Sequence, residues 1–73
     1  MEDVLKFDAV KAVSAAMDSV NLINTLKAKE SLSDEDYVLL LKNQKHLKIM
    51  LAKPEFVSAL LDNQKSLVNS AVL

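Results

Sequence analysis

The side chain best suited to acid–base chemistry near neutral pH is the single histidine, His46, because imidazole titrates there without help from its surroundings. A catalytic base also needs a nucleophile and an orienting acid within reach. The sequence around His46 supplies Lys42, Asn43 and Lys45 instead. We therefore interpret His46 as an imidazole in solvent or at the edge of an interface, and we expect neither an enzyme nor any catalytic residue.

Metal and cofactor sites are not predicted either. The chain contains no Cys, which excludes disulfides and thiolate ligands, and no cluster of His, Asp and Glu at ligand spacing surrounds His46. It also contains no Gly, and a phosphate-cradling loop needs Gly. We expect no metal, no cofactor and no small-molecule substrate.

The charged residues could in principle hold a cation, a basic partner or phosphate groups. Asp34, Glu35 and Asp36 form an acidic trio, and several lysines follow it. Within one helix, acids at the start and lysines in the second half are also what the helix dipole favours. With no Arg and a net charge of −1, nucleic-acid binding is not expected. Weak association of Lys42, Lys45 and Lys53 with an anionic surface remains open.

Two glutamines interrupt otherwise apolar helix stripes. Gln44 and Gln64 each lie among leucines at helical spacing. Either both lie at the edge of a stripe and reach water, or they form a buried amide pair that fixes register within the chain or across a subunit contact. Both are therefore candidate interface residues.

The elements that position these residues are three predicted helices, at about 7–29, 34–52 and 54–72. The first has an apolar stripe at a spacing of three and four residues, formed by Ala9, Val13, Ala16, Val20 and Ile23. The second begins at the N-cap Ser33, with Asp36 as its capping-box partner. Pro54 separates the second helix from the third and suits the first position of a helix. Short connections predict a compact, all-α, three-helix arrangement with antiparallel neighbours.

The second and third predicted helices contain similar segments. Residues 40–47 and 60–67 are identical at six of eight positions, and the predicted helix starts at Asp34 and Pro54 have the same offset of twenty residues. Two Leu-rich amphipathic helices can resemble one another by chance. Alternatively, both helices present an equivalent face, as in a pseudo-symmetric pair.

The chain is expected to be one domain, 1–73, and to be oligomeric. A domain of this size buries only about 60% of its unfolded surface, while 51% of its residues are hydrophobic. With disulfides and metals excluded, association with other protein remains as a source of stability. The apolar residues left outside the helix stripes are the remaining interface candidates, Val38, Ile49, Met50, Phe56 and Leu73.

A central segment resembles short, poorly characterised proteins of tailed bacteriophages. The residues that carry the resemblance are 32–36, Asn43 and the run 46–53, His-Leu-Lys-Ile-Met-Leu-Ala-Lys. The similarity covers about twenty-two of 73 residues, and the chain departs from the pattern after Lys53, where Pro54-Glu55-Phe56 matches only loosely. The resemblance implies a virion component or accessory factor and transfers no functional residue.

The sequence therefore predicts a non-enzymatic structural or assembly protein that acts through helix-face packing. A minor phage virion protein, such as a decoration or connector subunit, is the specific form of this expectation. The alternative is a small regulator that binds and inhibits a host protein through one helix face. The acidic N-terminus and the lack of a long apolar run predict a protein without a membrane span, made inside the cell (the host cytoplasm if phage-encoded) or carried in the virion.

Overall fold

The computed structural model describes residues 8–73, which form four α-helices and no strand. The helices are α1 (Ala9–Lys27), α2 (Asp34–Leu51), α3 (Pro54–Ala59) and α4 (Asp62–Ala71). The predicted all-α class is confirmed. The predicted start of the first helix at Phe7 lies outside the described residues.

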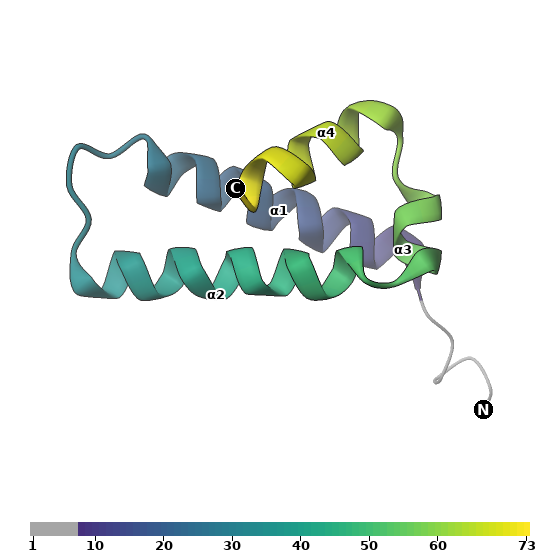
Figure 1. Ribbon diagram of the computed structural model, residues 1–73, viewed down its shortest axis with the longest axis horizontal. Helices are drawn as coiled ribbons and strands as arrows, with labels where there is room; N and C mark the ends of the chain where they lie inside the picture. Colours follow the sequence, from purple (N-terminus) through teal and green to yellow (C-terminus); the bar gives the residue numbers. More distant parts are fainter. Residues whose placement is uncertain (1–7) are drawn as a thin grey trace.

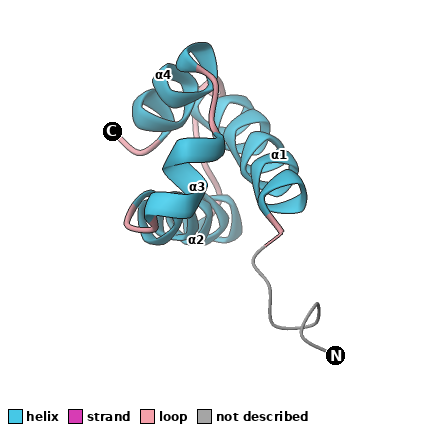
Figure 2. Cartoon of the chain, turned by 90° about the vertical axis from the view of Figure 1, so that its right-hand side faces the viewer, coloured by secondary structure: helices cyan, strands magenta, loops and turns pink. Residues whose placement is uncertain are grey.

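Helices α1 and α2 form an antiparallel pair joined by residues 28–33 (Figure 1). The short helix α3 crosses one end of this pair, and α4 then returns over α1. Viewed end-on, α1, α2 and α4 surround a common interior (Figure 2). Helix α1 packs against all three other helices, so it is the central element of the fold.

The prediction of one continuous third helix is wrong. The chain is extended at Leu60 and Leu61, with ψ angles of 139° and 162°. In an unbroken helix, Phe56 and Val68 would point about 120° apart, at 100° per residue. The break lets both side chains reach the interior, where each is fully buried. Tertiary packing therefore explains an interruption that neither Gly nor Pro imposes at this position.

The first two helices begin and end close to their predicted limits. The N-cap Ser33 is confirmed, since its hydroxyl oxygen accepts a hydrogen bond from the Asp36 amide at 3.1 Å. Helix α1 ends at Lys27, two residues before the predicted end. It begins after an N-cap that the sequence analysis missed, Asp8, whose carboxylate accepts from the Lys11 amide at 3.1 Å. None of the residues from 8 to 73 has a positive φ angle.

The hydrophobic core takes residues from all four helices and from the break between α3 and α4. Its buried members are Ala16, Val20, Ile23, Leu26, Leu40, Leu47, Phe56, Leu60, Val68 and Ala71. The predicted stripe of the first helix supplies its share of this core. The core contains no buried polar residue among those described, so its stability comes from apolar burial and close packing.

Phe56 requires a correction. We predicted it to lie outside the core and to contact a partner, because it falls off the stripe of a continuous third helix. Instead, α3 ends at Ala59, the continuous apolar stripe does not form, and Phe56 is completely buried. It is a core residue of this chain and cannot serve as an exposed partner contact.

Candidate interaction surface

Among the described helices, α2 carries most of the exposed large apolar side chains. This helix places only Leu40 and Leu47 in the core. Four of its large apolar side chains are about half exposed, namely Tyr37, Val38, Leu41 and Ile49. Exposed apolar groups that gather on one element are typical of protein–protein contacts.

Five residues form a line along the side of α2 that faces away from the core, here called the outer row. All five are exposed, and they are Glu35, Val38, Lys42, Lys45 and Ile49. At 100° per residue they lie within about 80° of one another, opposite the buried Leu40 and Leu47. Their alternating spacing of three and four residues is that of a helix-packing seam.

The first half of the outer row borders an open hollow of about 360 Å³, here called the α2 hollow. Its lining residues are Asp34, Glu35, Val38, Leu39 and Lys42. Carboxylates therefore stand at one end, aliphatic side chains in the middle and an ammonium group at the other end. Such a surface can pack against an apolar side chain and select the orientation of a charged neighbour.

The remaining apolar interface candidates lie in different places. Val38 and Ile49 are 55% and 52% exposed, and Leu73 at the C-terminal end is 90% exposed. Met50 is half-buried and packs against the core. The structure therefore brings Val38 and Ile49 together on one face of one helix and leaves Leu73 apart from them.

Two strongly exposed apolar residues were missed in the sequence analysis. Val10 is 80% and Leu61 65% exposed, and both border a second hollow of about 280 Å³ between the start of α1 and the α3–α4 junction. Leu61 lies within the predicted third helix, 54–72, and was not among the predicted interface residues. Its exposure follows from the break, at which neither Gly nor Pro is present.

Both candidate glutamines are half-buried and bond within the chain. The Gln44 side-chain amide donates to the Ala71 carbonyl at 3.1 Å. The Gln64 side-chain oxygen accepts from the Leu61 backbone N–H at 2.9 Å. Among residues 8–73 they form no amide pair with each other, and each satisfies one end of α4.

The C-terminal end of α4 has a second donor, Lys27, which the sequence analysis did not single out. Its ammonium group donates to the carbonyl oxygens of Ser70, Ala71 and Leu73 at 3.3, 3.3 and 3.0 Å. A positive charge at this position also suits the negative end of the helix dipole. Lys27 at the end of α1 and Gln44 in the middle of α2 thus hold the C-terminal end of α4 against two helices that are far away in sequence.

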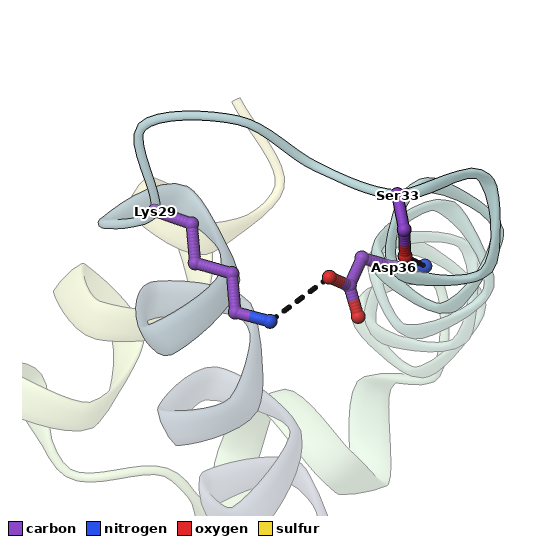
Figure 3. A network of polar contacts seen from close by, with 3 residues as sticks. All are labelled: Lys29, Ser33 and Asp36. Atoms are coloured by element: carbon purple, nitrogen blue, oxygen red, sulfur yellow. Dashed lines mark hydrogen bonds and ion pairs between the residues drawn. The ribbon is translucent and has the colours of Figure 1, made fainter.

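An ion pair joins the connection between α1 and α2 to the first turn of α2 (Figure 3). The Lys29 ammonium lies 2.9 Å from a carboxylate oxygen of Asp36. The hydrogen bond from Lys29 holds the pKa of the Asp36 carboxyl below its usual value, against the opposing effect of burial. The positive charge of Lys29 and the hydrogen bonds with Ser33 lower this pKa further. The predicted capping box is therefore half right, because Ser33 caps the helix while the carboxylate of Asp36 binds Lys29.

Other candidate chemistry is not assembled within the described chain. His46 is exposed on α2. Across residues 8–73, no three His, Cys, Asp or Glu side chains gather as a metal would require. In the same part of the chain, no helix combines the length and the apolar character needed to cross a bilayer.

Comparison with protein-family models, with curated proteins and with solved structures finds no match to this chain. The exposed face of α2 and the small size of the core are therefore the features of this chain that bear on its function.

Proposed function

We propose that this chain is a non-enzymatic structural or assembly protein, which works by packing helix faces against other protein subunits. The observation that carries the proposal is the outer row of α2, where Val38 and Ile49 are exposed on a helix whose opposite side is in the core. Burying a fully exposed Val or Ile side chain contributes about 1.5–3 kcal/mol. Because Val38 and Ile49 are 55% and 52% exposed, covering either one would stabilise a complex by roughly half of that.

The size of the chain supports the same proposal. Within residues 8–73 the core has ten buried residues, of which two are alanines. A core this small gives a marginal stability that subunit contacts commonly supplement. Association would stabilise this fold and use the apolar surface that the fold leaves exposed.

A minor virion protein, such as a decoration or connector subunit, is the specific form of the proposal. The resemblance to short proteins of tailed phages covers residues 32–53, and this range contains the whole of α2. The segment that carries the resemblance is therefore the segment that carries the exposed apolar row, which is what an assembly role requires.

A second candidate function is a small regulator that inhibits a host protein. The α2 hollow favours it, because an open apolar depression with charged ends is also suited to receive one foreign side chain or helix. The two candidates differ in whether the chain associates with itself.

The experiment is light scattering across a dilution series. We expect a mass above that of one chain at high concentration, falling toward it on dilution. The double substitution Val38→Lys with Ile49→Lys should yield a single chain at every concentration, since it places charge on both apolar positions of the outer row.

The matched control is Val10→Lys on α1, which changes a residue that is 80% exposed and lies outside the outer row. It should leave the association unchanged, and circular dichroism should show equal helix content in all variants. A wild-type chain that remains single throughout the series would contradict self-association and favour the regulator.

A further inference from the structure

The charges around the α2 hollow have an order that a second copy of the same helix can match. Along α2, Glu35 precedes Val38 and Leu39, and Lys42 follows them. Reversing the helix direction reverses this order. We infer that the occupant of the α2 hollow is a second copy of this chain, whose α2 lies antiparallel across it and pairs Glu35 of each copy with Lys42 of the other.

This inference rests on the proposed function and specifies its partner, orientation and register. A twofold axis midway between Val38 and Leu39 brings each Glu35 opposite the other copy's Lys42 and each Val38 opposite the other copy's Leu39. The same patch is then used on both copies, as in closed dimers. All four residues are exposed in the single chain, so none has to leave the core.

The charges that would pair are available. The ion pair seen within residues 8–73 joins Lys29 and Asp36, while Glu35 and Lys42 have no hydrogen-bonded or ionic partner in that part of the chain. Exposed ion pairs contribute only about 0–1 kcal/mol each. Their main effect is therefore on orientation, while burial of Val38 and Leu39 supplies the attraction.

Two other arrangements of two α2 helices bring like charges together. A parallel pair would place Glu35 beside Glu35 and Lys42 beside Lys42. An antiparallel pair that matched Val38 with Ile49 would place Lys42 opposite Lys45. The reason is that Lys42 follows Val38 by four residues and Lys45 precedes Ile49 by four. The register centred between Val38 and Leu39 avoids both conflicts, because it combines apolar contact with opposite charges at Glu35 and Lys42.

The first test exchanges the charges. Glu35→Lys and Lys42→Glu should each raise the dissociation constant of the homodimer by about tenfold or more, since two attractive pairs become repulsive. An equimolar mixture of the two variants should associate as tightly as wild type, because both pairs are restored in the heterodimer. Sedimentation velocity at low ionic strength measures each case, and 0.5 M salt should reduce the differences.

The matched control is Lys11→Glu, an exposed charge reversal on α1, which should leave the dissociation constant unchanged. Tight association of the mixture would also exclude an effect on helix stability as the cause. Each variant chain carries the same substitution alone and in the mixture, so a destabilised helix would weaken association in both.

The second test fixes the register. Val38→Lys should abolish the dimer, whereas Ile49→Lys on the same outer row should leave it within about twofold, because Ile49 lies beyond the contact. Equal damage by both substitutions would overturn the register. A wild type that associates but ignores both charge reversals would overturn the inference while leaving the proposed function intact. A wild type that never associates would refute both self-association and this dimer.

Discussion

Residues 40–47 and 60–67 differ at only two of eight positions, yet they adopt different structures. The first copy lies inside the continuous helix α2, while the second begins in the extended break and continues into α4. Leu40 and its counterpart Leu60 are both buried. In contrast, Leu47 lies in the core while its counterpart Leu67 is 44% exposed. Local sequence set the tendency to be helical, and packing decided where the helix stopped.

One of the two differences fits its new location. Lys42 in the first copy corresponds to Asp62 in the second, and Asp62 is the first residue of α4. An acid is favourable at the positive end of a helix dipole, whereas a lysine there is unfavourable. In the middle of α2 either sign is acceptable. The pair therefore shows how a single residue can favour a helix start inside an otherwise repeated segment.

The largest test of this comparison truncates the equivalent leucines. Leu47→Ala should lower the free energy of unfolding by about 2–5 kcal/mol, since it leaves a cavity in the core. Leu67→Ala should cost less than about 1 kcal/mol, because its side chain is already half in water. Chemical denaturation measures both, and equal losses would show that the two copies are packed alike after all.

The equivalent glutamines give an intermediate effect. Gln64→Ala should cost about 1 kcal/mol, since the Leu61 N–H at the start of α4 loses its side-chain partner. Gln44→Ala should cost less, because Lys27 still donates to the same Ala71 carbonyl. Thermal unfolding of the two variants and of Lys27→Ala would rank the contributions, and a larger loss for Gln44→Ala would contradict the shared cap.

The smallest expected effect on stability concerns the starts of the two helices α2 and α3. Helix α2 starts with the Ser33 cap and the Lys29–Asp36 ion pair, whereas α3 starts at Pro54 without a side-chain cap. Because the pKa of Asp36 is lowered in the folded state, its stabilising effect is present above the unfolded pKa of about 4 and is lost as the pH falls through the folded value.

Asp36→Asn should therefore weaken the decline of stability below pH of about 4, by a small amount because the pair is exposed. Denaturant midpoints of wild type and variant between neutral and acidic pH measure it. Parallel pH profiles for the two proteins would show that the ion pair contributes nothing to folding.

The parts of the fold that follow from local chemistry could be predicted from the sequence. The stripe ending at Ile23, the Ser33 cap and the start at Pro54 each depend on residues close in sequence. The break at Leu60–Leu61 and the burial of Phe56 depend on α1, which is far away in the chain. No periodicity within residues 54–72 contains that information.

The candidate surface was predictable to a similar extent. Val38 and Ile49 fall outside the apolar stripe of α2, and both are exposed. Their difference was not predictable, since Val38 lines the α2 hollow and Ile49 does not. The hydrogen bonds of Gln44 and Gln64 at opposite ends of α4 could not be predicted. They form only because the chain turns back at Leu60–Leu61, where the sequence predicts a continuous helix.

The connections of this protein all use ordinary backbone conformations, as residues 8–73 contain no positive φ angle. No connection therefore requires Gly or Asn, and most residue types can occupy these positions without steric strain. Substitutions can accumulate in the turns while the helix faces are preserved. Two such proteins could share this architecture with no turn motif in common, and their kinship would be visible only in the spacing of their buried and contacting side chains.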